Sequence, residues 1–523
     1  MAEVTLRTLS QLVEQAADQY GDHIAIEDGA TQLSYTQLNT ARRRSAAAFV
    51  AAGLSRGDRI AIWAPNIYQW ILAAIGAQTL GIVLVPINTR WKGAEAAYAL
   101  NMSQVKILFT VGDFLGQCYP DLLAGEELPH LQQIVMLAGT ATDTLGWDEF
   151  LAGGADISDQ QVDELAALVT PDDVLDIGFT SGTTGAPKGV VTTHGQNIRV
   201  FEVYTQTIGL RSDDNYLIIS PFFHSFGYKA GWLSAIICGA KILPVLTFDL
   251  DSVLAQIERD KVTMLPGAPT IYQSILAHPN RKDYDLSSLR LCSTGAAPVP
   301  VELVNQMRNE LKFEVVVTAY GMTETCGVIT ICRPDDPADI ISGSSGRAME
   351  GVEVKIVDRD GDELPRGEAG EIWTRGYNVM QCYLDNPQAT AETITPDGWL
   401  KTGDIGVMDA GGYVDITDRI KDMFIVGGFN CYPAEIENRL CSLEGVSQAA
   451  VIGMPDERMG EVACAFVIPM PGANLDAQQL IDWCKDNMAN YKVPRVLHLV
   501  DSLPTNASGK VLKTELRLQV SSA

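Results

Sequence analysis

The stretch Thr180-Ser181-Gly182-Thr183-Thr184-Gly185-Ala186-Pro187-Lys188-Gly189 decides how the rest of the sequence is interpreted. It follows the apolar run Val174-Leu175-Asp176-Ile177-Gly178-Phe179, which predicts a short strand. Four hydroxyl side chains, three glycines and one lysine fall within these ten residues. Glycine lets a backbone approach a ligand closely, and exposed amides, hydroxyls and a lysine are what a polyphosphate needs. The stretch therefore predicts a phosphate-binding loop.

The loop does not match the common Walker phosphate motif, in which Gly-Lys precedes Ser or Thr. Here Pro187 precedes Lys188 and Gly189 follows it. Clusters of Ser, Thr and Gly are also typical of flexible surface loops. From this stretch alone, a phosphate loop and a surface loop are equal alternatives, and the rest of the chain has to decide between them.

Composition and charge indicate a globular protein of more than one domain. The chain has 523 residues, more than a single hydrophobic core accommodates. Its 65 acidic and 38 basic side chains give a net charge of −27, which argues against a nucleic-acid partner or a general binder of anionic membranes. A small anionic ligand stays compatible with this charge, because it needs only a few local cations.

The sequence shows no targeting, membrane or metal signal. The N-terminus lacks the charged-then-apolar pattern of a secretory signal. The apolar stretches 71–88 and 231–248 are each interrupted by polar residues and proline, so we expect no integral membrane segment. The ten cysteines form no CxxC pair, which together with the missing signal indicates reduced thiols and a cytoplasmic location. A homodimer is compatible with the sequence.

The spacing of apolar residues predicts an α/β fold. The kind of secondary structure that it predicts changes near residues 345 and 420. Strand and helix patterns alternate across residues 1–150 and again after the Thr180 loop, which predicts two mostly parallel sheets covered by helices. Residues 151–170 are acidic and irregular and predict a surface connection. The β-type runs and turns of 345–420 indicate a small antiparallel unit such as a barrel. Residues 421–523 mix short strands and helices, which suits one small α+β domain.

Further motifs follow the loop along the chain. Each alone allows a plain explanation, such as a turn, a surface ion pair, a helix cap or a tail. They are Tyr320-Gly321-Met322-Thr323-Glu324, Thr402-Gly403-Asp404, the segment Asp418-Arg419-Ile420-Lys421-Asp422 with Val426-Gly427-Gly428-Phe429-Asn430, and Pro504-Thr505-Asn506-Ala507-Ser508-Gly509-Lys510. Together with the loop, and in this order, they resemble the adenylate-forming family of acyl-CoA synthetases, peptide-synthetase adenylation domains and firefly-type luciferases. The resemblance extends over almost the whole chain.

The resemblance implies a domain organisation and a reaction. It implies an N-terminal AMP-binding domain over residues 1–420, with a barrel-like part at about 345–420, and a mobile C-terminal domain over residues 421–523 that turns about Lys421 and carries Lys510. In such enzymes, ATP and a carboxylic acid form an acyl-adenylate and release pyrophosphate, and the thiol of CoA then displaces AMP. The expected cofactors and substrates are therefore ATP, Mg²⁺, CoA and a carboxylic acid.

The same resemblance implies roles for individual residues. The expected catalytic residues are Lys510, Thr323, Glu324 and His224, of which Glu324 would also hold Mg²⁺. The expected nucleotide and CoA contacts are Thr180, Ser181, Gly182, Thr183, Thr184, Gly185 and Lys188 for the β- and γ-phosphates, Gly295, Ala296, Ala297, Tyr320 and Gly321 for adenine, Asp404 and Arg419 for ribose, Lys421 for the hinge, and Gly427 and Gly428 for the pantetheine arm. His224 allows two interpretations, a wall of the thiol tunnel or a packing residue.

The acyl pocket is expected between the His224 region, the end of the strand before Gly295 and the segment after Glu324. Its expected lining is Phe223, Phe226, Tyr228, Lys229, Trp232, Thr294, Gly321 and Met322. The aromatic residues suit an apolar or ring-bearing acid. Within the family, the chain looks most like fatty-acyl-CoA ligases and ligases of steroid-ring propanoates. Lys229 leaves two alternatives open, a contact with a keto group of the substrate or an ion pair with a protein carboxylate.

Other activities share parts of this pattern. A stand-alone acyl-AMP ligase would transfer the acyl group to a carrier protein instead of CoA. A luciferase-type oxygenase shares the first half-reaction, and a non-catalytic nucleotide-binding protein would share the fold. The last is disfavoured, because the charged positions that the family pattern calls for are all present, namely Lys188, Glu324, Asp404, Arg419 and Lys510.

Overall fold

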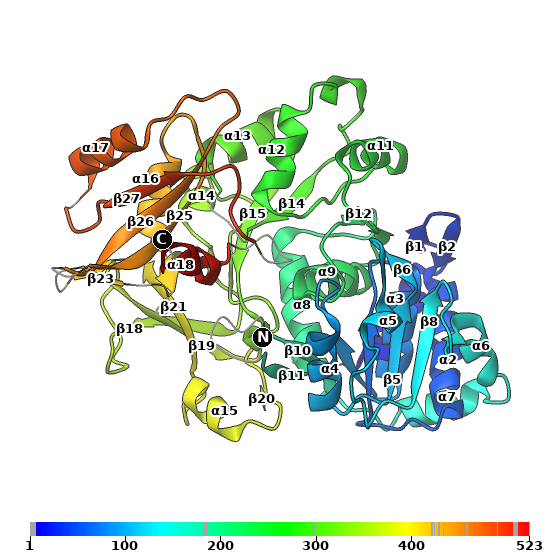
Figure 1. Cartoon of the computed structure of the whole chain (residues 1–523). Helices are drawn as coiled ribbons and strands as arrows, with labels where there is room; N and C mark the ends of the chain where they lie inside the picture. Colours follow the sequence, from blue (N-terminus) through cyan, green and yellow to red (C-terminus); the bar gives the residue numbers. More distant parts are fainter. Residues whose placement is uncertain are drawn as a thin grey trace.

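The fold is given by a computed structural model, which describes residues 7–180, 187–295, 299–419, 422, 424–426, 429–431, 433–456, 459–488, 490–505 and 511–521. A large N-terminal part of α/β layers runs from blue to yellow in Figure 1, and a small α+β domain in orange and red lies beside it. The large α/β part and the small α+β domain that were expected from the sequence are therefore both present. None of the helices in the described ranges is long and apolar enough to cross a membrane.

A mostly parallel sheet with the strand order β20-β11-β10-β4-β3-β5-β8-β9 forms the first layer. The strands from β10 to β9 run parallel, whereas β11 and β20 are antiparallel additions at one edge. The strands are β3 (Arg59–Trp63), β4 (Val83–Pro86), β5 (Ile107–Val111), β8 (Gln133–Ala138), β9 (Leu145–Gly146), β10 (Val174–Phe179), β11 (Gly189–Thr193) and β20 (Cys382–Tyr383), with a separate hairpin of β6 (Asp113–Phe114) and β7 (Gln117–Cys118). The predicted phosphate loop connects β10 to β11 at this edge.

The second layer consists of two strand groups with the orders β12-β13-β1-β2 and β14-β15-β16-β17. Met264 joins them, because it forms isolated bridges to both Tyr216 and Leu291. Over residues 262–265 the structure has only isolated bridges and no full strand. The strands are β1 (Ile24–Asp28), β2 (Thr31–Ser34), β12 (Asn215–Ile218), β13 (Lys241–Pro244), β14 (Leu291–Thr294), β15 (Val315–Tyr320), β16 (Thr330–Ile331) and β17 (Arg347–Ala348).

Helices cover both layers, and several of them start at side-chain caps that the sequence announces. Thr8, Ser34 and Thr193 each form a capping box with a glutamine three residues later, and so begin α1, α2 and α8. The helices are α1 (Leu9–Tyr20), α2 (Tyr35–Ala51), α3 (Tyr68–Thr79), α4 (Gly93–Met102), α5 (Tyr119–Leu122), α6 (Trp147–Gly153), α7 (Asp159–Ala166), α8 (His194–Ile208), α9 (Ser225–Gly227), η1 (Tyr228–Leu233), α10 (Ser234–Cys238), α11 (Leu250–Asp260), α12 (Pro269–Ala277), η2 (Arg281–Asp283), α13 (Val301–Asn309), η3 (Thr323–Thr325), α14 (Ala338–Gly343) and α15 (Pro387–Thr393).

The prediction of an irregular connection at 151–170 is wrong, because this segment includes the end of α6 and all of α7. Ser158 caps α7 in a capping box with Gln161, and Val162 is buried on its inner face. The acidic composition hid this amphipathic pattern. Asp163 pairs with Arg43 of α2, so an acidic side chain helps to fix the helix on the layer.

An antiparallel sheet with the order β18-β19-β21-β22, here called the half-barrel sheet, follows the α/β layers. It confirms the antiparallel unit expected near residues 345–420. The C-terminal domain has its own sheet, in which β25 and β26 form a long antiparallel pair. The elements are β18 (Val352–Val357), β19 (Ala369–Gly376), β21 (Leu400–Met408), β22 (Val414–Arg419), β23 (Phe424–Val426), β24 (Phe429–Cys431), α16 (Pro433–Cys441), β25 (Val446–Asp456), β26 (Gly460–Pro469), α17 (Ala477–Asn487), β27 (Val496–Leu499) and α18 (Lys513–Ser521).

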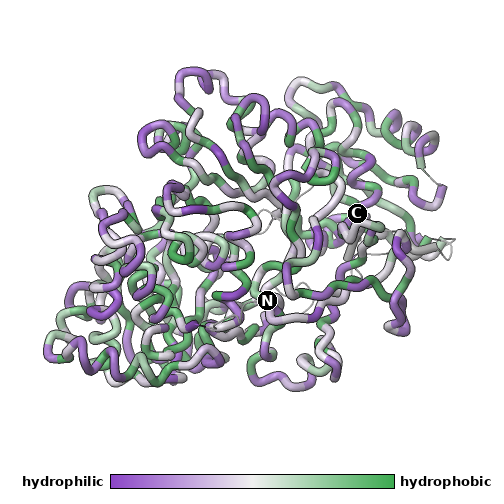
Figure 2. Tube along the Cα trace, turned by 180° about the vertical axis from the view of Figure 1, so that it is seen from behind, coloured by the Kyte–Doolittle hydropathy of each residue, from purple (hydrophilic) through white to green (hydrophobic). Residues whose placement is uncertain are grey.

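Separate hydrophobic cores hold these parts together. One large cluster of buried side chains extends through both α/β layers, while the C-terminal domain has smaller clusters on the two faces of β25 and β26. Figure 2 shows hydrophobic stretches running through the interior of each part and hydrophilic ones on the outer loops and helices. The half-barrel sheet has a small core of its own around Ile356, Ile372 and Val414.

His194, the first residue of α8, is a buried group that makes the fold sensitive to acid. Its Nδ1 accepts a hydrogen bond of 3.1 Å from the backbone amide of Leu9, the first residue of α1. Burial lowers the pKa of this imidazole to about 4. Between about pH 6.5 and pH 4 the unfolded chain therefore takes up a proton that the folded chain does not, and stability falls as the pH falls.

We expect the His194→Gln variant to lose less stability in acid than the wild type. For the wild type, this one group should lower the free energy of unfolding by about 2 kcal/mol between pH 7.5 and pH 5. Urea unfolding at the two pH values measures the difference, and His130→Gln, at an exposed histidine, is the control. An equal acid loss in His194→Gln and the wild type would contradict the assignment.

Candidate active site

The ends of the predicted phosphate loop meet at the edge of the first layer. Phe179 of β10 lies opposite Gly189 of β11 in antiparallel register. Just beyond them, the amide of Thr180 donates to the carbonyl of Lys188 over 3.0 Å, and the amide of Lys188 lies 3.4 Å from Thr180 Oγ1. The hairpin therefore places Thr180 and Lys188 side by side at the base of the loop.

The Tyr320–Glu324 motif lies against the base of this loop. It begins at the last residue of β15 and ends in the short helix η3, where Glu324 is buried. A Cβ added at Gly178 of β10 would come within 3.0 Å of Thr323 Cγ2, so glycine at this strand position allows the motif to approach. Gly321 has no room for a side chain, because its Cβ would lie 2.2 Å from the carbonyl oxygen of Gly327.

Tyr383 connects the loop to the motif, and the sequence did not single it out. Its hydroxyl donates to Glu324 Oε1 over 2.8 Å. The ammonium of Lys188 lies 4.7 Å from the centroid of its ring, which is a cation–π contact. Tyr383 reaches this position because β20 pairs with β11. A strand this short leaves no periodic signal in the sequence, so only the aromatic residue before Asp385-Asn386-Pro387 could have drawn attention to it.

A second contact joins the Tyr320 motif to the half-barrel sheet. The hydroxyl of Tyr320 donates to Asp404 Oδ2 over 2.5 Å, and Asp404 is buried. Asp404 lies opposite Arg419 in the register of β21 and β22. The side chains predicted for adenine and ribose are therefore adjacent, although 84 residues separate Tyr320 from Asp404. Gly295 lies next to the strand that carries Tyr320, since a Cβ added at Gly295 would lie 3.4 Å from the carbonyl oxygen of Ala319.

His224 lies at the start of α9, beyond the end of β12. Its side chain is exposed, and its Nδ1 accepts a hydrogen bond of 3.2 Å from the amide of Phe226, which leaves the proton of the neutral ring on Nε2. Although the ring is open to water, the protein around it lowers its pKa through desolvation. Phe223 and Phe226 on either side are half-buried, as is Met322. These side chains have surface left for a ligand.

Three residues expected to line the acyl pocket lie in the core instead. Tyr228 and Trp232 are 1% and 0% exposed, and their rings stack with centroids 4.7 Å apart beside Trp70. Lys229, also buried, forms an ion pair with Asp176 of β10 at 3.1 Å. Of the two alternatives for Lys229, the structure has the protein carboxylate. The expectation of direct substrate contact by these three is therefore corrected, because no face of them is accessible to a ligand.

The remaining expected residues are placed only in part. Thr294 ends β14 and is 2% exposed, with no hydrogen-bond partner for its Oγ1 among the described residues. Arg419 is placed by its backbone. Outside the described residues lie Ser181, Gly182, Thr183, Thr184, Gly185, Ala296, Ala297, Lys421, Gly427, Gly428 and Lys510.

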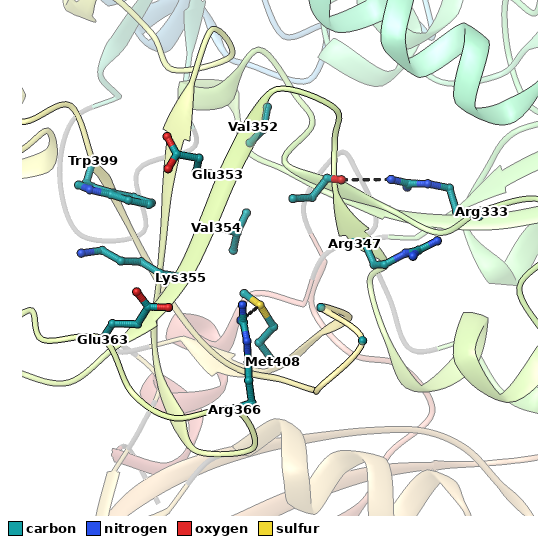
Figure 3. Close-up of a pocket in the computed structure, with 13 residues that line it drawn as sticks. Arg333, Arg347, Val352, Glu353, Val354, Lys355, Glu363, Arg366, Trp399 and Met408 are labelled. Atoms are coloured by element: carbon teal, nitrogen blue, oxygen red, sulfur yellow. Dashed lines mark hydrogen bonds between the residues drawn. The ribbon is translucent and has the colours of Figure 1, made fainter.

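A polar pocket on the half-barrel sheet is separate from this site. It has a volume of about 620 Å³, and Figure 3 shows Arg333, Arg347, Lys355 and Arg366 around it. Arg333 donates to the carbonyls of Ile331 and Ala348. Arg347 lies over the ring of Tyr413, and Lys355 lies over the rings of Trp373 and Trp399. Arg366 donates to the sulfur of Met408. None of the residues expected for nucleotide or acid lines it, so the pocket is not the candidate active site.

The donor atoms near the loop fit a metal that arrives with a phosphate ligand. Within the described ranges, no cluster of three or more His, Cys, Asp or Glu side chains could hold a metal ion alone. Mg²⁺ commonly takes one or two carboxylates and completes its shell with phosphate oxygens and water. A single buried carboxylate, Glu324, beside the base of a phosphate loop matches this donor set.

Comparison with known proteins shows the family. The model of the AMP-binding enzymes matches residues 13–384, and that of the AMP-binding enzyme C-terminal domain matches residues 435–510. Two curated relatives carry the name 3-[(3aS,4S,7aS)-7a-methyl-1,5-dioxo-octahydro-1H-inden-4-yl]propanoyl:CoA ligase. The one from Rhodococcus jostii is 48% identical and the one from Mycobacterium tuberculosis 46%, each over 98% of this chain and 98% or 99% of the relative.

A solved structure has the same architecture throughout. The anthranilate CoA ligase AuaEII, in complex with anthranoyl-AMP, superposes with a TM-score of 0.89 at 28% identity and covers 99% of this chain and 98% of its own. The likeness includes both the α/β layers and the small C-terminal domain. The chain thus belongs to the AMP-binding, adenylate-forming enzymes, and within them it is an acyl-CoA ligase, an acid–thiol ligase that uses ATP and CoA.

Proposed function

We propose that the chain activates a propanoate carried on a partly reduced, keto-bearing ring system and transfers it to CoA. The observation that carries this proposal is the identity of 48% and 46% to two relatives named for such an acid, over nearly the full length of both. Half-buried Phe223 and Phe226 beside His224 support it, because the exposed part of an aromatic ring packs more favourably against a ring-bearing ligand than against water. A plain medium-chain fatty acid is the second candidate, since another relative is named a medium-chain acyl-CoA ligase.

We assign the pyrophosphate end of ATP to the loop of 180–189. Lys188 and the loop amides would neutralise the β- and γ-phosphates, which leave together. Glu324 would hold the Mg²⁺ that accompanies ATP, and this ion would supply charge neutralisation between the phosphates. Thr323, the residue before it, would contact the α-phosphate. The closeness of Thr323 to Gly178 supports a single site for these groups.

The nucleoside end is assigned to the Tyr320–Asp404 contact. The Tyr320 ring would cover adenine beside Gly295 and Gly321, where added side chains would meet backbone atoms. Asp404 would accept hydrogen bonds from the ribose hydroxyls, as an ionised carboxylate can. Because Asp404 is already held by the hydroxyl of Tyr320, its orientation is set before ATP arrives. Arg419, its partner in the register, completes this wall.

The acid and the thiol are assigned to opposite sides of the α-phosphate. The carboxylate attacks the α-phosphorus, and Lys510 would neutralise the charge that grows on the oxygens. Thioester formation needs a path for the pantetheine thiol, which we assign to His224, Gly427 and Gly428. A rotation of the C-terminal domain, residues 421–523, about Lys421 would move Lys510 out of the site and open this path. The thiol loses its proton as its sulfur attacks the acyl carbon and AMP leaves.

Substrate choice is the part of this proposal with the clearest outcome. Pyrophosphate release with ATP, Mg²⁺ and CoA should be compared for a bicyclic diketo propanoate, octanoate, and an aryl propanoate of similar size. We expect kcat/KM for the bicyclic acid to exceed that for octanoate at least about tenfold, because rings fill an aromatic-lined pocket that a flexible chain fills only at an entropy cost. A preference for octanoate would favour the second candidate. Dependence of the acyl product on a carrier protein instead of CoA would contradict both.

A further inference from the structure

We propose that Tyr383 is a positioning residue that holds the Glu324 carboxylate and the Lys188 ammonium apart, each ready for one partner in the magnesium complex of ATP. The inference rests on the proposed roles of Glu324 and Lys188, and it adds a residue that neither the sequence motifs nor those roles include. One side chain contacts both charges, through its hydroxyl on one side and its ring face on the other.

The two contacts are geometrically independent. The hydroxyl donates to Glu324 Oε1 over 2.8 Å, which restrains the position of one of the two carboxylate oxygens. The ammonium of Lys188 lies over the ring face, 4.7 Å from the centroid. The hydroxyl makes the first contact and the ring face makes the second, so the two contacts use different parts of the side chain. Removing the hydroxyl would therefore affect the first contact and leave the second.

Tyr383 is fixed from behind, so it can act as a rigid support. It is 6% exposed and packs with Val190, Met380 and Ala389. Its amide donates to Thr390 Oγ1 over 3.0 Å, and the amide of the next residue donates to the carbonyl of Gly189 over 2.7 Å. The amide of Met380 also donates to the carbonyl of Glu324, over 2.8 Å. The short segment 380–384 thus touches both the loop end and the motif.

A spacer between these two charges has a physical purpose. Lys188 lies over the face of the Tyr383 ring, and the opposite charge of Glu324 is bound at the hydroxyl end of the same side chain. Without the ring, the ammonium and the carboxylate would attract one another and pair. Such a pair would have to be broken at a cost in binding when ATP arrives. The aromatic ring holds the ammonium by a weaker cation–π contact, from which phosphate oxygens can take it.

Two variants separate the hydroxyl from the ring. Tyr383→Phe keeps the ring under Lys188 and removes the donor to Glu324, whereas Tyr383→Leu removes both. Tyr377→Phe is a matched control in the connection that leads from β19 to β20. The hydroxyl of Tyr377 donates to the carbonyl of Glu350 over 3.0 Å and its ring carries Arg199 at 3.9 Å, but it does not contact Glu324 or Lys188.

The readout is ATP binding measured by calorimetry on the full chain, without acid or CoA, once with Mg²⁺ and once with EDTA. For the wild type, Mg²⁺ should tighten ATP binding. For Tyr383→Phe, we expect this gain to shrink about tenfold while binding in EDTA stays unchanged, because only the orientation of the carboxylate is lost. For Tyr383→Leu, binding in EDTA should weaken as well, since Lys188 is then free to pair with Glu324. Tyr377→Phe should match the wild type in both conditions.

The outcomes distinguish this inference from the proposal on which it rests. A wild-type magnesium gain that Tyr383→Phe retains in full would overturn the positioning role and leave the roles of Glu324 and Lys188 intact. A wild type whose ATP binding is indifferent to Mg²⁺ would overturn both. If Tyr383→Leu fails to fold, Tyr383→Phe carries the test alone, and Tyr383→His, which keeps a flat ring with a donor, should restore part of the magnesium gain.

Discussion

Lys510→Ala should remove adenylate formation and leave thioester formation from a supplied acyl-adenylate close to that of the wild type. The physical reason is that the anionic carboxylate and the anionic α-phosphate oxygens must approach one another in the first half-reaction only, where a missing donor costs about 10²–10³-fold in rate. In the second half-reaction the acyl–phosphate bond is already activated, and the thiol attacks the acyl carbon. Pyrophosphate exchange measures the first step, and CoA thioester production from synthetic acyl-AMP measures the second.

A control on the same domain makes the split specific. Lys485 lies on the exposed α17 and pairs with Asp482, so Lys485→Ala removes one positive charge from the C-terminal domain without touching the motif. We expect both half-reactions of this variant to stay within about twofold of the wild type, because exposed ion pairs contribute little. If Lys510→Ala slowed both half-reactions equally, Lys510 would serve the fold or the nucleotide site as a whole, and the division of labour between the two half-reactions would be wrong.

The local parts of the fold could be predicted from the sequence because they depend on neighbouring residues alone. The strand β10 was expected with the bounds that the structure has, since its apolar run marks it, and the capping box at Thr8 marks the start of α1 in the same local way. The α7 helix was missed because acidic residues cover its outer face. Residues 262–265 form only bridges, because pairing is decided by the neighbours at Tyr216 and Leu291 rather than by the segment itself.

The candidate site was predictable where a family motif carries it, and unpredictable where tertiary contacts create it. Tyr320 and Asp404 were both expected, and their direct hydrogen bond agrees with a shared nucleoside site. Tyr383 was not expected, because its role arises only when β20 docks beside β11. Tyr228 and Trp232 show the reverse error. Aromatic residues that line a pocket and those that fill a core look alike in a sequence. The kink at Gly231 within η1, which lies between Tyr228 and Trp232, leaves no signal in the composition that these rings are buried.

The ion pair between Lys229 and Asp176 supports the site from inside the core, and breaking it should have the largest effect on stability. Lys229 lies in η1, just after the His224 segment, and Asp176 lies in β10, just before the phosphate loop. Both side chains are almost completely buried, and Thr192 Oγ1 donates to the same carboxylate oxygen over 2.7 Å. The other oxygen of Asp176 has no hydrogen-bond partner among the described residues. The carboxylate therefore depends strongly on the lysine.

Lys229→Met should lower the free energy of unfolding by about 3–5 kcal/mol, because it fills the same space and leaves a buried carboxylate without its counter-ion. Adding Asp176→Asn should recover most of that loss, since a neutral amide can still accept from Thr192 and needs no cation. Urea unfolding of the two single variants and the double variant gives the coupling energy directly. A loss below about 1 kcal/mol for Lys229→Met would mean that water reaches the pair. If instead the double variant regained stability but not ATP affinity, the charged pair itself would be needed to hold β10, and with it the phosphate loop, in place against the His224 segment.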